Sequence, residues 1–286
     1  MKNKTLKFAF LYSLIVMALM ACDDNDEYYY VGPGNSWISY GNLEKIDNGT
    51  PSKFAIRRDD GNRLIVTEGV PLNFREATED LRVYVNYSIL GSERDENGLD
   101  GKMNYYIRLY ALDDVLTKSP VKQSFIDENE TVRQDSIGND PINVKEVWFG
   151  GRYLNLEFKI PVKEESKTKH MINLVQEDVV NHNDTIYLTL RHNAFGEKPN
   201  DGDTHEKYFW NRGRVSFDLT SILPNGQTSV PVKLIWNEYG KNISEIITRE
   251  DSGVYTLLNA QNENHGRALN YSAKLENEEL PECTIE

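Results

Sequence analysis

The sequence predicts an all-β protein built from two successive β domains. Apolar and polar residues alternate with a period of two in many short segments, and no segment keeps an apolar stripe at helical spacing. Clusters of Gly, Pro, Asn and Asp separate these segments, as turns separate strands. A polar stretch from Lys118 to Pro141 divides the segments into two groups. We therefore expect one β domain at 37–118, a polar linker at 119–141 and a second β domain at 142–286.

The first domain contains short strands with turns between them. The turn-forming residues 59–62 lie between the alternating segments 53–57 and 63–66, an arrangement that predicts a β-hairpin. Segments 81–89 and 105–111 each place apolar side chains on one face and polar side chains on the other. Such strands predict a small barrel or a sandwich.

The second domain repeats this pattern over more strands. Gly150 and Gly151 separate its first two strands, and Pro161 ends the second. Pro231 predicts an edge position for the last strand, because proline cannot donate a hydrogen bond to a neighbour. Six or seven strands of this kind predict a β-sandwich. The alternating segments lie at 144–149, 153–160, 170–174, 186–192, 215–219 and 230–236.

Residues 1–21 predict a signal peptide. A start with three lysines precedes an apolar run that is too short to span a bilayer, since a spanning helix needs about 20 residues. The sequence LMAC at 19–22 is similar to a bacterial lipobox, although Met20 stands where a small residue is usual. We therefore expect acylation of Cys22, which would become the mature N-terminus and attach the chain to a membrane.

The segment 22–36 predicts an acidic tether. It begins with five polar residues, four of them acidic, at 23–27 and contains a structure-breaking Gly-Pro-Gly at 32–34. Loss of the signal peptide removes three lysines and no acidic residue, so the formal charge changes from −13 to −16. A body this acidic is repelled by nucleic acid, which is therefore not an expected partner.

No sequence pattern predicts a catalytic residue, a cofactor or a metal site. The chain lacks a Gly-x-Ser-x-Gly elbow, and Cys283, the one cysteine besides Cys22, is flanked by acidic residues near the C-terminus. His170 and His192 fall in phase with apolar strand faces and could meet inside the sandwich, as core histidines or as a metal pair. The acidic loop around His205 lacks EF-hand spacing. Among 45 acidic residues, no carboxylate pair for a glycosidase can be assigned.

Several segments resemble the NigD-like lipoproteins of Bacteroidetes. Residues 81–88 and 106–110 are similar to the first domain of that family, and residues 147–156, with His170 and Leu174 downstream, are similar to the second. The resemblance covers nearly all of the mature chain in the same order, and it implies an OB-like barrel followed by a β-sandwich. The family's name comes from association with a bacteriocin locus and implies no reaction, ligand or catalytic residue.

An OB-like barrel suggests one candidate binding surface. Such barrels bind oligonucleotides or oligosaccharides on one face through exposed aromatic rings. Tyr84, Tyr106 and Tyr110 lie opposite the core-facing residues of their strands and could form a stacking platform, although tyrosine also simply suits half-exposed strands. Because the charge disfavours nucleic acid, a sugar or a protein would be the ligand.

We expect a non-enzymatic, lipid-anchored envelope protein whose β domains bind an unidentified protein or glycan. The acidic stretch after Cys22 resembles an export signal of Bacteroidetes surface lipoproteins, which favours the outer face of the outer membrane. A spacer on the periplasmic face stays open. Two alternatives remain: a bacteriocin-associated or immunity protein, from the family's name, and a glycan-active enzyme with unassigned carboxylates.

Overall fold

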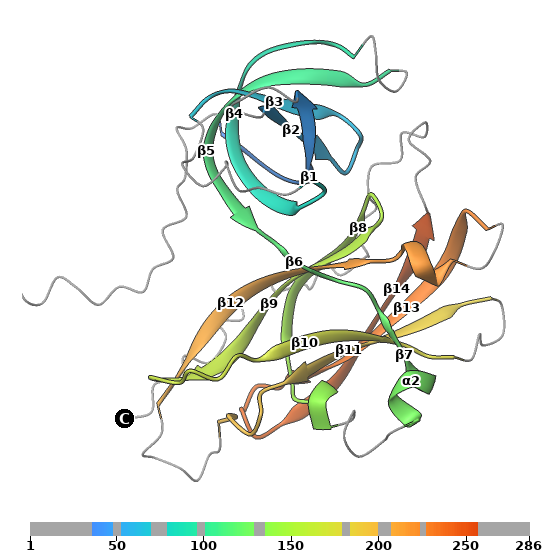
Figure 1. Ribbon diagram of the computed structural model, residues 1–286. Coiled ribbons are helices and arrows are strands. Elements are labelled where there is room, and N and C mark those ends of the chain that lie inside the picture. Colours follow the sequence, from blue (N-terminus) through green and yellow to red (C-terminus); the bar gives the residue numbers. More distant parts are fainter. Residues whose placement is uncertain are drawn as a thin grey trace, which may run out of the picture.

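The fold consists of a closed barrel and a two-sheet sandwich, one above the other in Figure 1. This arrangement confirms the predicted all-β class and the order of the two domains. The signal peptide, Cys22 and nearly all of the tether lie outside the part of the chain that the structure describes. The computed structural model describes residues 36–47, 53–69, 79–95, 101–128, 135–178, 184–199, 207–223 and 227–256. Among these residues, no helix has the length and apolar character needed to cross a bilayer.

The N-terminal barrel closes five strands in the order β1-β2-β3-β5-β4. Strands β3 and β5 run parallel, and the other neighbouring pairs are antiparallel. The predicted hairpin is confirmed, because β2 pairs with β3 across the turn at 59–62. Closure buries one face of every strand and leaves no free sheet edge. The strands are β1 (Trp37–Asp47), β2 (Lys53–Arg58), β3 (Arg63–Glu68), β4 (Arg82–Arg94) and β5 (Met103–Asp114).

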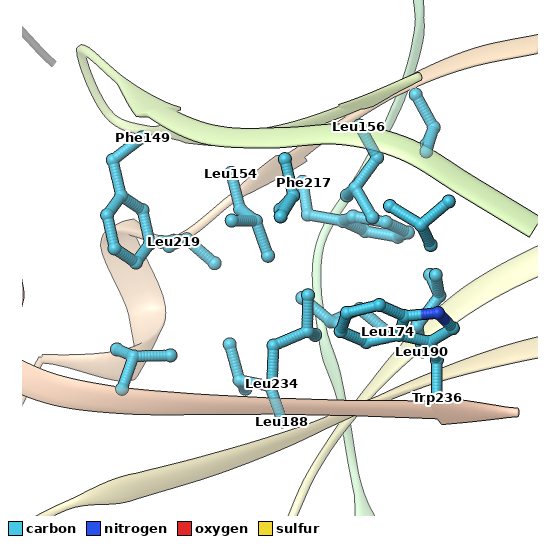
Figure 2. Packing of buried hydrophobic residues seen from close by; sticks show 14 of the residues in the cluster. Phe149, Leu154, Leu156, Leu174, Leu188, Leu190, Phe217, Leu219, Leu234 and Trp236 are labelled. Atoms are coloured by element: carbon cyan, nitrogen blue, oxygen red, sulfur yellow. The ribbon is translucent and has the colours of Figure 1, made fainter. Parts of the chain in front are cut away.

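The C-terminal sandwich packs a five-stranded sheet, β14-β13-β11-β10-β7, against a four-stranded sheet, β6-β12-β9-β8. Figure 2 shows Leu154, Leu156 and Phe217 of the smaller sheet facing the side chains of Leu188 and Trp236 on the larger one. Burying each such side chain stabilises the fold by about 1.5–3 kcal/mol. The longer strands are β8 (Asn143–Gly150), β9 (Tyr153–Lys163), β10 (Met171–Gln176), β11 (Ile186–Asn193), β12 (Tyr208–Asp218), β13 (Ser229–Tyr239) and β14 (Ile246–Thr256).

The chain enters the sandwich earlier than the sequence predicts. Strand β6 (Leu116–Lys118), expected in the first domain, pairs in parallel with β12, and β7 (Val121–Lys122), expected in the linker, pairs in parallel with β10. The short helix α2 (Gln123–Asp127) follows at once and buries Ile126 against Val175. A few apolar side chains within a polar stretch are therefore enough to hold this segment against the sandwich (Figure 1).

The position of strand β13 in its sheet differs from the position that the sequence predicts. Pro231 predicts an edge strand, yet β13 lies between β14 and β11. The pairing with β11 begins at Val232, one residue later, so Pro231 has a paired neighbour only in β14. The proline therefore occupies a position that is locally an edge, where its missing N–H costs no hydrogen bond to β11.

Candidate functional site: a basic pocket beside the domain junction

The two domains meet around Arg82, a residue that the alternating pattern would place on a solvated face. Arg82 is only 1% exposed because the sandwich covers it. Its Nη2 donates to Oδ2 of Asp59 in the barrel at 2.7 Å and to Oδ1 of Asn155 on β9 at 2.9 Å. Its Nε donates to Oγ of Ser216 on β12 at 3.3 Å. The guanidinium carbon lies 4.2 Å from the ring centroid of Tyr153. One buried cation thus joins the barrel to two strands of the sandwich.

Further contacts surround this arginine. The Tyr40 hydroxyl donates to Oε1 of Glu157 at 3.0 Å, and burial together with the Glu157 carboxylate raises the pKa of Tyr40. Asn42 Nδ2 donates to the Tyr153 hydroxyl at 2.7 Å. Gly150 supplies the space that this close approach needs, because a Cβ there would lie 2.3 Å from Oδ2 of Asp59. The glycine is therefore required by the contact between domains.

The three tyrosines of the predicted stacking platform take different positions. Tyr84 lies at the junction, where its ring centroid is 5.1 Å from that of Tyr40. The Tyr106 hydroxyl donates to Oε1 of Glu93 at 2.6 Å, and the Tyr110 hydroxyl is 3.0 Å from Oγ of Ser88, both within the barrel. A ligand role for these three residues stays a prediction.

A pocket of about 380 Å³ opens on the outer face of the smaller sheet, next to the junction. This volume lies within the range of small-molecule sites in proteins. The pocket draws its walls from three adjacent strands and includes four basic and two acidic side chains. The lining residues are Lys145, Glu146, Glu157, Phe158, Lys159, Arg212, Gly213 and Arg214.

Strand register explains how these charges gather. Glu157 on β9 stands directly opposite Arg214 on β12, and Arg214 Nε donates to Oε1 of Glu157 at 3.0 Å. One step further along the same face, Lys159 stands directly opposite Arg212, so two like charges face each other across the strands. Lys145 joins this second row from β8, because the register shift between Val144 and Glu146 leaves it outside the regular pairing.

The second row of the pocket is electrostatically unfavourable. Burial lowers the pKa of Lys145, and the charges of Lys159 and Arg212 lower it further, while Glu238 opposes the change. Burial and the charge of Arg212 also lower the pKa of Lys159. Like charges that stand directly opposite in a sheet are destabilising. The fold therefore tolerates three mutually repelling cations in one concave place.

The two core histidines meet, as their strand phase suggests. His170 Nδ1 and His192 Nε2 are 3.0 Å apart, and His192 Nδ1 is 2.9 Å from the carbonyl oxygen of Pro141. Because a carbonyl only accepts, His192 Nδ1 carries the proton, and His192 Nε2 accepts from His170. The described residues contain no group of three or more His, Cys, Asp or Glu side chains placed to hold a metal ion.

The sequence alone does not predict which residues line the pocket. Lys159 is visible only as a polar member of the alternating segment 153–160, and Arg212 and Arg214 lie just before the predicted segment 215–219. What brings them together is the register between β9 and β12, strands about fifty residues apart in the chain, and a bulge in β8. Neither can be read from local alternation.

A closed five-stranded barrel joined through a buried arginine to a β-sandwich defines the chain as a two-domain all-β protein. The family model described as the NigD-like C-terminal beta sandwich domain matches residues 123–249. A solved structure from Parabacteroides distasonis, described as toxin-related, is 30% identical and covers 78% of this chain and 94% of its own, with a TM-score of 0.54. The chain belongs to the NigD-like family.

Two further solved structures share the fold. A DUF1344 protein of unknown function from Bacteroides vulgatus is 21% identical, with a TM-score of 0.55, and the alignment covers 81% of this chain and 95% of the other. A NigD-like immunity protein from Bacteroides caccae is 19% identical, with a TM-score of 0.52, over 74% of this chain and 91% of the other. No match was found among curated proteins.

Proposed function

We propose that this chain is a non-enzymatic, lipid-anchored protein of the cell envelope that binds an envelope protein or glycan through its basic pocket. The observation that carries the proposal is a pocket with four cations on a mature chain of formal charge −16. A cationic concavity on an acidic body concentrates attraction at one place and leaves the rest of the surface repulsive to acidic partners.

Attachment rests on the N-terminal sequence. Acylation of Cys22 would anchor the mature chain, since each buried CH₂ contributes about 0.8 kcal/mol to membrane binding. The tether at 22–36 would hold both β domains away from the lipid. Its acidic beginning favours the outer face of the outer membrane. The partner would therefore be a component of the cell surface.

A binding role fits the carboxylates of the pocket better than catalysis does. Glu146 and Glu157 stand opposite each other on β8 and β9, and they are the pair that a glycan-active enzyme would use here. Oε1 of Glu157, however, already accepts hydrogen bonds from Tyr40 and from Arg214. Oε1 of Glu157 is therefore engaged within the protein, which leaves only Oε2 for a ligand and disfavours a catalytic role for this carboxylate.

Protease accessibility on intact cells, combined with site-specific crosslinking, tests the proposal. A photo-crosslinking amino acid at Glu146 should capture a reproducible partner, and the same group at Lys233, on the other sheet, should not. Cys22→Ala should release the protein from the membrane fraction. Protection from protease would favour the periplasmic face. A properly anchored protein that crosslinks nothing from the pocket would contradict the binding role.

An immunity role is the second candidate. The toxin-related description of the 30% identical structure and the immunity description of the more distant one favour it. Cells expressing the chain should then survive a bacteriocin that kills control cells. Equal killing of both strains would refute this role and leave the binding proposal intact.

A further inference from the structure

We propose that the basic pocket is a binding site for an anionic saccharide, a sugar that carries carboxylate, sulfate or phosphate groups. The inference rests on the proposed function and names the ligand class of the same site. Its starting point is the second row of the pocket, in which Lys159 stands opposite Arg212, and Lys145, from the register shift in β8, lines the same pocket.

The repulsion among these basic side chains destabilises the fold, and a bound anion would relieve it. Cross-strand pairs of like charge are destabilising, and Lys159 stands directly opposite Arg212 in this row. Sites that bind or react commonly violate such local rules. An oxyanion between the three side chains would turn repulsion into charge-assisted hydrogen bonds.

The acidic members of the lining select the kind of anion. Glu146 and Glu157 contribute carboxylates to the same pocket, beside the basic row. An acidic peptide would bring further carboxylates against them and would be repelled. A saccharide offers hydroxyl groups, which donate hydrogen bonds to carboxylates, as well as its anionic substituent. A mixed lining of this kind therefore suits an anionic sugar better than an acidic protein segment.

The Arg214 side chain and the backbone of β9 and β12 are also held in place before any ligand arrives. Arg214 is fixed by Glu157 and by the ring of Tyr84, whose centroid lies 4.1 Å from the guanidinium carbon. Lys159 and Arg212 project from the central part of a continuous antiparallel pairing that spans the whole of β12. Pre-organised groups lose less conformational freedom on binding, which favours recognition of a small ligand.

Isothermal titration calorimetry tests the inference with defined probes. The protein is the mature chain with the substitution Cys22→Ala, which carries no lipid. The probes are trigalacturonic acid, a heparin tetrasaccharide, neutral maltotetraose and a hexaglutamate peptide, each at low and at physiological ionic strength. At least one of the two anionic sugars should bind, and maltotetraose should not. Lys159→Gln and Arg212→Gln should each weaken that binding about tenfold or more, the loss expected for one charge-assisted contact.

Lys233→Gln is the matched control, because it removes the same charge from β13, where Lys233 pairs with Glu250 at 2.7 Å. It should leave the affinity unchanged. Equal weakening by Lys233→Gln would mean attraction by net charge alone and would overturn the inference. Binding of hexaglutamate as tight as that of the sugars would assign the pocket to acidic peptides instead, and binding of no probe would also overturn it.

The crosslinking experiment distinguishes a failure of the saccharide proposal from a failure of the proposed binding function. If no anionic sugar binds while the group at Glu146 still captures an envelope protein, the ligand class is wrong and the binding function stands. If both fail, the pocket is not the binding surface. Circular dichroism and thermal melting of each variant show that it is folded, so that a lost signal reports the pocket.

Discussion

The buried histidine pair gives this fold a sensitivity to acid that can be worked out from the structure. His192 is fully buried, and burial lowers its pKa to about 4 from an ordinary value near 6.5, with the hydrogen bond to Pro141 opposing the change. Between these two pH values the unfolded chain binds a proton at this position that the folded chain does not. Acid therefore favours unfolding, and the stability that neutral His192 provides is lost as the pH falls through this window.

The size of the effect follows from the shift in pKa. A difference of one pKa unit corresponds to 1.36 kcal/mol, so the full contribution is about 3 kcal/mol, lost at about 1.4 kcal/mol per pH unit between pH 6.5 and pH 4. His170, whose pKa burial also lowers, adds a loss of the same sign, while Glu197 and Asp140 reduce it.

Urea titrations at pH 7 and pH 4.5, followed by tryptophan fluorescence, to which the buried Trp236 contributes, measure this loss. His192→Gln keeps an amide donor for Pro141 but cannot titrate, so its stability should fall by about 2 kcal/mol less than that of the wild type over this interval. Equal losses in the wild type and in His192→Gln would refute the reasoning.

Three further substitutions test the junction and the pocket. Arg82→Met leaves Asp59 without its cation and should lower the free energy of unfolding by about 3–5 kcal/mol, measured in urea, with part of the loss recovered in the double variant with Asp59→Asn. Gly150→Ala forces a Cβ toward Asp59 and should cost about 1–3 kcal/mol in the same assay, whereas Gly91→Ala, which meets nothing within 4 Å, should cost far less. Lys159→Gln should raise the melting temperature, because removing a like-charge pair stabilises by about 0.2–1 kcal/mol, and an unchanged or lower value would show that the row is not repulsive.

The sequence predicts those features that depend on local pattern. Alternation over 53–66 is enough for the hairpin of β2 and β3, since a turn and two half-buried faces define it. The meeting of His170 and His192 also follows from local phase, because both point to the inner side of neighbouring strands that pair with each other. In both cases the information lies within one strand or in two successive ones.

The sequence does not predict features that depend on contacts between distant segments of the chain. Arg82 is a polar residue in an alternating strand, and its burial is made favourable by Asp59 of the barrel together with Asn155 and Ser216 of the sandwich. Strand β6 is too short and too polar to be recognised, and its partner β12 lies about a hundred residues away. Long-range pairing of this kind leaves almost no local trace.

Junction and pocket share the same two strands, which links the architecture to the proposed activity. Asn155 and Ser216 contact Arg82, and two residues further along the same faces Glu157 and Arg214 line the pocket. The barrel therefore covers the part of the outer face around Asn155 and Ser216, and the pocket lies next to it. Through Tyr40, which donates to Glu157, it also fixes the carboxylate that orients Arg214. On this argument the barrel supports the binding site although none of its residues is among those that line the pocket, because Tyr40 and Tyr84 hold Glu157 and Arg214 in place.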